Sequence, residues 1–310
     1  MLRPTPKIAA KTADDWLMGI SCLLLTLFFL QTASADDSIP VIHKAVGEVQ
    51  LAVVATDRSG RPVLNLTPAE VSVVDDGRPV SHFDLRPAAD LPLRVGIVLD
   101  LSDSMRKTWP SLRTTLEQSL QQVLRPEDLV LVMAFDNKIE LQQVLAPQQR
   151  FDEVEIPQAG GLTALYDTLY AACHHPVFEA RQPRRSALII FSDGEDNLSR
   201  HGIDDAIESA ESAGIAVYSI SARPRRRRST GASVLRDLAA ATGGRSFVTS
   251  SDTEVEAALM TIKDELRASY LLYYRTPSES GGRQFRRVNL LPTAIGGPSL
   301  RSRAGYYLGP

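Results

Sequence analysis

Three apolar runs bounded by polar residues occupy the middle of the chain, at residues 93–99, 128–135 and 187–191. Nearly unbroken hydrophobicity over so few residues is typical of strands that are buried on both faces of a parallel sheet. Three further strands complete the expected series, at residues 139–145, 215–220 and 245–249. The strand at 139–145 alternates apolar and polar residues, so we expect one of its faces to be solvated.

Apolar residues at helical spacing lie between these strands. The clearest pattern covers residues 109–124 and predicts a helix that Pro126 ends. Further helices are expected after Thr163 and over residues 203–213, 232–242 and 252–268. Gly214 suits the position just past a helix, and Asp252 can cap the last helix. Strands that alternate with helices predict an α/β fold in which helices cover both faces of a mostly parallel sheet.

The segments on either side of this region have a different, β-rich pattern. Before it, strands are expected at residues 49–55 and 70–74, each followed by a polar turn. After it, strands are expected at residues 270–274, 285–291 and 301–308. We expect residues 36–90 and 270–310 to pack together as one discontinuous β domain around a central domain of residues 91–269.

The first 35 residues resemble an export signal. A basic segment precedes an apolar stretch from Leu17 to Leu30, and Ala33-Ser34-Ala35 forms a small-x-small cleavage site. The apolar stretch is shorter than the ~20 residues that a membrane span requires. We therefore expect cleavage after Ala35, no stable membrane span afterwards, and a periplasmic, cell-surface or secreted protein. The alternative is an uncleaved membrane anchor.

Composition narrows the function classes. The chain has 310 residues, of which 44% are hydrophobic and 23% are charged, which is typical of a globular protein. Its formal net charge of −3 gives no overall basic field, so nucleic acid is not an expected partner. The basic run Arg223–Arg228 lacks interleaved aromatic residues, and we expect a solvated loop rather than a site for nucleic acid, glycan or lipid.

Cysteine and histidine do not form a recognisable metal motif. Cys173 is the only cysteine left after signal cleavage, so it is either buried or available to pair with a partner. Cys173-His174-His175 has no second half at metal-ligand spacing. We interpret these residues as a helix end with surface histidines. Trp109 is equally compatible with an exposed contact residue and with a buried staple on the following helix.

Oxygen-bearing side chains follow the ends of two buried strands. The first of these strands is followed by Asp100-Leu101-Ser102-Asp103-Ser104, and the second is followed by Ser192-Asp193-Gly194. Between them in the sequence, a helix begins with Gly160-Gly161-Leu162-Thr163. Ligands of open α/β sheets bind at the carboxyl ends of the strands, so these segments are expected to converge. A set of oxygen ligands suits a hard cation, namely Mg²⁺, Mn²⁺ or Ca²⁺. The candidate metal ligands are Asp100, Ser102, Ser104, Thr163 and Asp193.

Each of these residues also has a purely structural explanation. The two serines and Thr163 can be helix N-caps, and Asp100 and Asp193 can belong to plain polar turns. Glu195 and Asp196, directly after this set, are expected to be solvated.

The pattern Asp100-x-Ser102-x-Ser104, followed by Thr163 and Asp193, resembles the metal-ion-dependent adhesion site of von Willebrand factor type A (VWA) domains. The resemblance covers roughly residues 90–250. Segments such as Gly161–Asp167 and Thr242–Arg245 extend it to bacterial exported proteins of this kind. One departure is Asp103, which stands where a small residue is usual. It either adds negative charge near the ion or points to solvent.

The resemblance implies a Rossmann-like, doubly wound sheet, a bound Mg²⁺ and a role in protein–protein interaction or adhesion. A cation held by hydroxyl ligands, with carboxylates acting partly through water, keeps positive charge. It would then accept a carboxylate donated by a protein partner.

Catalytic motifs of the common hydrolase and nucleotide-binding classes are absent from the sequence, which has no Gly-x-Ser-x-Gly, His-Glu-x-x-His, Walker A or Gly-x-Gly-x-x-Gly segment. We therefore expect a binding protein that is not an enzyme. Two alternatives stay open: a metal-dependent hydrolase of the phosphatase type, and a metal-free scaffold with a degenerate site.

Overall fold

The computed structural model describes residues 46–146, 149–179, 185–222, 230–277 and 283–308, which belong to one compact unit. The predicted signal segment and the Arg223–Arg228 run lie outside the described residues. No helix in the described ranges combines the length and apolarity needed to cross a bilayer.

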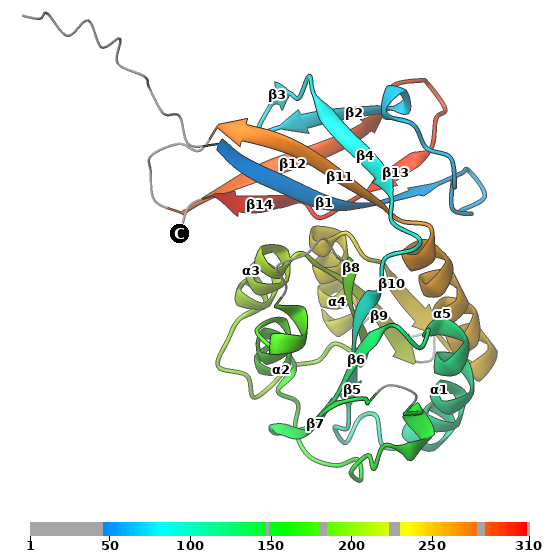
Figure 1. Ribbon diagram of the computed structural model, residues 1–310. Helices are drawn as coiled ribbons and strands as arrows, with labels where there is room; N and C mark the ends of the chain where they lie inside the picture. The colour runs from blue at the N-terminus through cyan, green and yellow to red at the C-terminus, as the bar shows by residue number, and fades with distance from the viewer. Residues whose placement is uncertain (1–45, 147–148, 180–184, 223–229, 278–282, 309–310) are drawn as a thin grey trace, which may run out of the picture. The chain divides into compact units, whose positions relative to one another are not determined.

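A six-stranded sheet forms the centre of the α/β domain (Figure 1). Its strands are, in chain order, β5 (Leu93–Asp100), β6 (Leu129–Phe135), β7 (Ile139–Val144), β8 (Arg185–Phe191), β9 (Ile215–Ala222) and β10 (Ser246–Thr249). They lie in the order β10-β9-β8-β5-β6-β7, and only β7 runs antiparallel to its neighbour. The chain thus winds outward from β5 in both directions, and the predicted Rossmann-like fold is confirmed.

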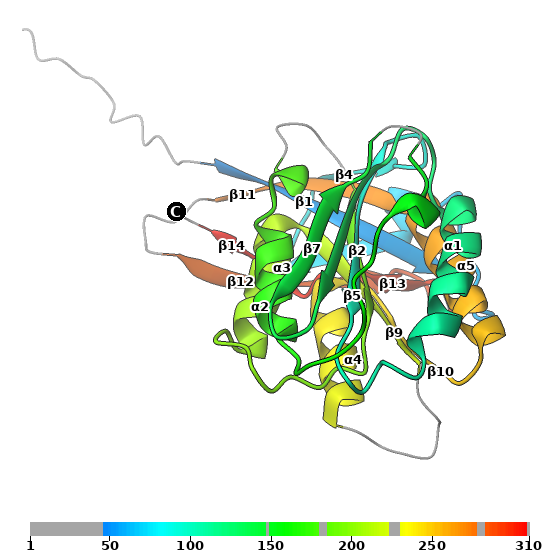
Figure 2. The same cartoon turned by 90° about the horizontal axis from the view of Figure 1, so that it is seen from below.

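Within the described residues, five α-helices cover the two faces of this sheet: α1 (Trp109–Val123), α2 (Leu165–Cys173), α3 (Ile203–Ala213), α4 (Thr230–Thr242) and α5 (Asp252–Arg267). Figure 2 shows α1 and α5 on one face and α2, α3 and α4 on the other. Each face has its own apolar core, because β5 alternates its buried side chains: Ile97 and Leu99 face α1 and α5, and Val98 faces the other helices. Short 3₁₀ turns occur at Pro68–Glu70, Phe151–Glu153 and Pro176–Phe178.

Several local predictions can be compared with the structure. Gly214 ends α3 in the left-handed conformation with φ of 65°, as its position predicts. The cap of α5 differs from the prediction: the Ser251 hydroxyl accepts from the backbone N–H of Glu254 at 3.3 Å, so Ser251 caps the helix instead of Asp252. Asp252 is the first helical residue and accepts a hydrogen bond from the Ser111 hydroxyl. Trp109 is buried in the α1 core, which favours the staple over the exposed contact residue.

The end of α2 carries the cysteine and the histidines. The Cys173 thiol is buried and free, and burial raises its pKa to about 12. Nδ1 of His174 lies 2.8 Å from the carbonyl of Tyr170, and Nδ1 of His175 accepts from the backbone of Val177. Both histidines therefore serve the helix end, as interpreted from the sequence.

Eight strands form a β sandwich of two four-stranded antiparallel sheets. One sheet has the order β13-β1-β11-β4 and the other β14-β12-β2-β3. The strands are β1 (Val46–Thr56), β2 (Val71–Asp75), β3 (Arg78–Pro79), β4 (Phe83–Pro87), β11 (Tyr270–Pro277), β12 (Gln284–Pro292), β13 (Ser299–Arg301) and β14 (Gly305–Leu308).

Strands from before and after the α/β domain pair with one another in this sandwich. β1 pairs with β11 from Val46↔Pro277 to Val53↔Tyr270, and β2 pairs with β12. The single strand expected at 301–308 is instead two strands, β13 and β14. They are interrupted where the backbone N–H of Ala304 donates to the carbonyl of Ala241 in the α/β domain, at 2.7 Å.

Candidate metal centre

The predicted ligands lie where the winding of the sheet reverses. Asp100 is the last residue of β5, and Asp193 lies two residues past the end of the neighbouring strand β8. The helices that follow β5 and β8 leave the sheet toward opposite faces. The loops therefore separate at this point and leave the strand ends open, which is the usual ligand position in open α/β sheets.

Asp100 is held in place by two neutral donors. Its Oδ1 accepts from the backbone N–H of Ser102 at 2.9 Å, and its Oδ2 accepts from the Ser192 hydroxyl at 2.5 Å. The Ser192 oxygen accepts in turn from the backbone N–H of Gly194 at 3.0 Å. Since the Ser102 and Ser104 hydroxyl oxygens are 3.1 Å apart, the Asp-x-Ser-x-Ser segment brings its three side chains together.

Two carboxylates are buried at this position. Asp100 and Asp193 each have 0% of their surface exposed. Burial raises the pKa of Asp100, the hydrogen bonds from Ser102 and Ser192 oppose that rise, and the negative charge of Asp193 adds to it. No basic side chain in the described ranges pairs with Asp100. The ionised carboxylate is therefore electrostatically unfavourable in the absence of a cation.

Thr163 lies in a loop that is bonded to both neighbouring loops. Its backbone carbonyl accepts from the N–H groups of Asn197 and Leu198, each at 3.1 Å. The preceding residues join the first loop, because Gly160 donates to the carbonyl of Leu101 at 2.6 Å. The Thr163 side chain is buried. Its hydroxyl makes no hydrogen bond to the other four candidate ligands within the residues described, so backbone contacts bring it to this edge of the sheet.

Two glycines are required by the backbone of these loops. Gly161 and Gly194 have φ of 104° and 79°, which is costly for any other residue. A Cβ atom on Gly194 would also overlap the carbonyl group of Gly231 at the start of α4. The Asp193 loop is thus packed directly against α4.

The acidic residues beside the candidate ligands have other partners. Asp103 is exposed and forms an ion pair with Arg106, so its charge is directed to the surface. Glu195 is exposed, as expected. Asp196 differs from the expectation of a solvated residue: it is half-buried and accepts hydrogen bonds from the backbone of Tyr166, at 3.1 Å, and from Ser199. The first turn of α2 has free N–H groups, and the Asp196 carboxylate satisfies one of them.

Sequence reasoning missed the residues that hold the cluster in place. Ser192 directly follows a buried strand, and this position is the feature of the sequence that could have identified it as part of the site. Asn137 accepts from the backbone N–H of Leu162 at 2.7 Å, and Asn197 accepts from that of Thr163 at 3.0 Å. Both asparagines lie in loops far from their partners in sequence, so no spacing rule could reveal these contacts.

The donor set fits a hard cation. It combines two buried carboxylates with hydroxyl oxygens, which are the ligand types that Mg²⁺ and Ca²⁺ prefer. Across the described residues, no group of three or more His, Cys, Asp or Glu side chains is placed to hold a metal. A site at Asp100 would therefore depend on hydroxyl ligands. A bound cation would supply positive charge to two buried carboxylates and offer a position for an outside oxygen ligand.

Comparison with known proteins identifies the family of the chain. The family model described as "VWA domain containing CoxE-like protein" matches residues 52–250. The chain belongs to the VWA domain family. Membership supports a role in protein–protein interaction or adhesion. None of the curated proteins is significantly similar in sequence.

Three of the solved structures to which the chain is similar come from different sources. A von Willebrand factor type A protein from Catenulispora acidiphila is 13% identical, with a TM-score of 0.47, over 79% of this chain and 76% of the other. Proximal thread matrix protein 1 from the mussel byssus is 16% identical, with a TM-score of 0.47, over 63% and 50%. The PilB minor pilin from Streptococcus sanguinis is 13% identical, with a TM-score of 0.46, over 62% and 63%.

Proposed function

We propose that this VWA-domain protein holds one divalent cation, Mg²⁺, Mn²⁺ or Ca²⁺, and uses it to bind a carboxylate of a protein partner. The proposed ligands are Asp100, Ser102, Ser104, Thr163 and Asp193. The observation that carries the proposal is the pair of buried carboxylates beside the touching hydroxyls of Ser102 and Ser104. A buried carboxylate such as Asp100, whose hydrogen-bond partners are neutral, is stabilised by a positive counter-charge, and the open strand ends give an outside ligand access to a cation there.

The surface around the cluster suits contact with a protein. Leu162 and Leu198 flank Thr163 and the Asp193 loop, and their side chains are 52% and 43% exposed. Leu198 donates its backbone N–H to the carbonyl of Thr163, so the exposed leucine lies directly beside a proposed ligand. Apolar groups next to a charged anchor give a partner both burial and orientation.

The proposal contains no catalytic step. The cluster supplies carboxylate and hydroxyl oxygens, and no histidine in the described ranges hydrogen-bonds to Asp100, Ser102 or Ser104. Phosphoester turnover that Asp193→Asn abolishes, together with normal partner binding, would favour the hydrolase instead.

We also propose export, with cleavage after Ala35. The support is the order of basic segment, apolar stretch and small-x-small site in the sequence. N-terminal sequencing of the protein from the producing cell tests this. A mature chain that begins at Asp36 in the envelope or medium is expected, and an intact leader in the cytoplasm would contradict it.

Cation binding is tested by thermal unfolding in Mg²⁺, Mn²⁺ and EDTA. A ligand that binds only the folded state stabilises it by about 2.7 kcal/mol at a hundredfold excess over Kd. Equal melting temperatures in all three solutions would refute occupancy of the site.

Partner binding is tested by a divalent-dependent pull-down from the envelope of the producing cell. Asp100→Ala is expected to lose the captured protein, whereas Asp103→Ala is the matched control because this neighbouring carboxylate pairs with Arg106 at the surface. Capture that survives Asp100→Ala, or that EDTA does not release, would place the interface elsewhere.

A further inference from the structure

A cavity lies in the β sandwich, on the side where β3 and β4 form the edges of its two sheets. β3 ends the sheet β14-β12-β2-β3, β4 ends the sheet β13-β1-β11-β4, and only residues 80–82 connect the two strands (Figure 1). The cavity has a volume of about 800 Å³ and takes its lining from both sheets. This volume is within the roughly 300–1,000 Å³ that is usual for small-molecule sites.

Arg286, on β12, supplies hydrogen-bond donors to this cavity. Its side chain is 10% exposed, and its Nε donates to Oδ1 of Asp75 at 3.0 Å. Its two Nη atoms make no hydrogen bond within the described residues, and they are not among the enclosed atoms without a partner. Arg286 is therefore fixed by one nitrogen and keeps two accessible nitrogens for a ligand.

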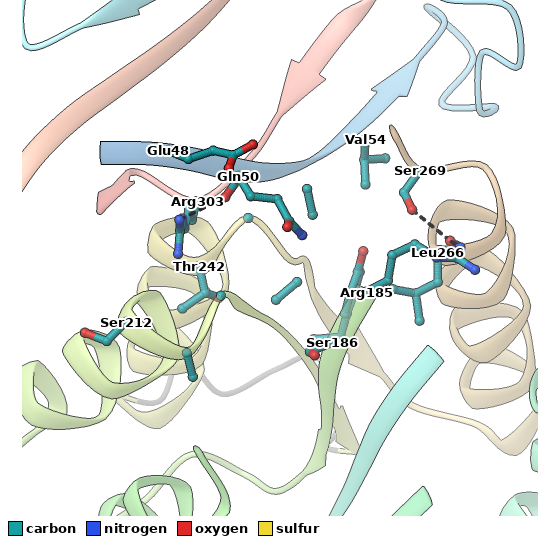
Figure 3. A pocket seen from close by; sticks show the side chains of 16 residues that line it. Glu48, Gln50, Val54, Arg185, Ser186, Ser212, Thr242, Leu266, Ser269 and Arg303 are labelled. Atoms are coloured by element: carbon teal, nitrogen blue, oxygen red, sulfur yellow. Dashed lines mark hydrogen bonds between the residues drawn. The ribbon is translucent and has the colours of Figure 1, made fainter. Parts of the chain in front are cut away.

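The arginines of another cavity differ in this respect. A cavity of about 300 Å³ beside Arg185 is lined by residues of β1 and by Arg303 (Figure 3). There, the Nη atoms of both arginines donate to backbone carbonyls, and both Nε atoms are enclosed without a partner. Accessible arginine donors thus distinguish the sandwich cavity from the cavity beside Arg185.

The charges around the sandwich cavity are balanced. Asp76 lies just outside the lining, and its negative charge also acts on Arg286. With Asp76 included, four carboxylates face four guanidinium groups, so neither an anion nor a cation is favoured as the ligand. The charged lining residues are Glu48, Asp75 and Asp84, and Arg78, Arg86, Arg275 and Arg286.

The lining combines donors, acceptors and apolar side chains. Guanidinium groups only donate hydrogen bonds, and carboxylates only accept them. Val80 and Phe83 add half-buried apolar side chains to the same lining. A ligand that uses all three kinds of group has hydroxyls, which both donate and accept, beside an apolar face of C–H groups. These are the properties of a sugar ring.

A peptide strand suits this edge less well than a sugar does. β4 carries Asp84 and Arg86, which pair with each other, and ends at Pro87. Charged residues and proline are typical of sheet edges that are protected against the pairing of a further strand. The paired Asp75 and Arg286 also give the cavity a polar lining, where an inserted strand would need to bury apolar side chains.

We propose that the sandwich cavity binds a neutral saccharide, whose hydroxyl groups accept from the Arg286 Nη atoms while the apolar face of a sugar ring packs against Phe83. This site does not depend on the metal proposed above, since all of its lining residues belong to the sandwich strands and their connections.

Isothermal titration calorimetry of the full mature chain tests the proposal. The saccharide probes are maltotriose, cellotriose and chitotriose, which share the pyranose ring and differ in linkage and in the N-acetyl group. Succinate is the anionic probe. Saturable binding of at least one saccharide is expected, and succinate should not bind. Saturable binding of succinate without binding of any saccharide would overturn the assignment to a neutral ligand.

Arg286→Lys removes the planar pair of Nη donors and keeps a positive charge beside Asp75. Saccharide affinity should fall about tenfold, because the lysine has no second nitrogen to donate. Arg287→Lys is the matched control, since Arg287 is the next residue on β12, is exposed, and lies outside the lining of the cavity.

Ser81→Trp blocks the cavity without removing a charged donor. Ser81 is an exposed lining residue in the connection between β3 and β4, so a larger side chain there should leave the fold intact and abolish saccharide binding. Ala294→Trp, at an exposed position outside the lining, is the control. The proposal is overturned if no saccharide binds saturably to wild type, or if a folded Arg286→Lys or Ser81→Trp binds as tightly as its control.

Discussion

Replacing Asp100 by asparagine separates the cost of its charge from the benefit of a cation. The amide keeps the shape of the side chain and one oxygen that accepts hydrogen bonds. It removes the negative charge that burial and Asp193 disfavour. In EDTA at neutral pH, the free energy of unfolding of Asp100→Asn should equal that of wild type or exceed it by up to about 2 kcal/mol.

The sign of the effect follows from the raised pKa of Asp100. Because the folded protein binds the proton more tightly than the unfolded chain, the penalty for ionisation is complete above the folded pKa. It disappears as the pH falls toward 3.8, the ordinary pKa of an aspartate side chain. The stability gap between the variant and wild type in EDTA should therefore close on acidification.

Adding Mg²⁺ should reverse the order of the two proteins. At a hundredfold excess over Kd, wild type gains about 2.7 kcal/mol, which for a domain of this size corresponds to a rise in Tm of roughly 5–10 °C. Asp100→Asn should gain little stability from Mg²⁺, because a neutral amide binds a cation more weakly than a carboxylate does. Calorimetric melts in EDTA and in Mg²⁺ measure both effects, with Asp103→Asn as the control expected to follow wild type. A variant that is clearly less stable than wild type in EDTA, or that gains as much from Mg²⁺, would refute the electrostatic reasoning.

Three further substitutions test the framework around the site. Gly194→Ala should lower stability by about 2–4 kcal/mol in chemical denaturation, because its φ of 79° and the Gly231 carbonyl leave no room for a methyl group; an unchanged midpoint would contradict this packing. Glu265→Gln should lower the free energy of unfolding by about 2–4 kcal/mol, because this buried carboxylate pairs with Arg245 and Arg301. An unchanged free energy in the same assay would mean that these ion pairs are not formed. Burial raises the pKa of Glu211 to about 7, so Glu211→Gln should stabilise the protein by about 1–3 kcal/mol above pH 7 and by progressively less toward pH 4.5; a gain that persists unchanged in acid would exclude this titration.

The sequence was sufficient for the α/β domain because its strands are buried on both faces. The seven residues of β8 are all buried, which requires the continuous apolar run seen at residues 187–191. Helix ends were less predictable where two polar residues compete. Ser251 and Asp252 are adjacent potential caps, and only the backbone geometry, extended at Ser251, decides between them.

For the candidate site, too, some features could be predicted from the sequence and others could not. The residues at the strand ends could be named from the sequence, since a strand end and its side-chain type are local properties. The hydrogen bonds that orient them could not be predicted. Asp100 takes its partner from Ser192, which is distant in sequence and becomes a neighbour only when β5 and β8 pair. The cavity beside Arg185 was invisible for the same reason, because its lining residues come from β1, from β8 and from the segment before β14.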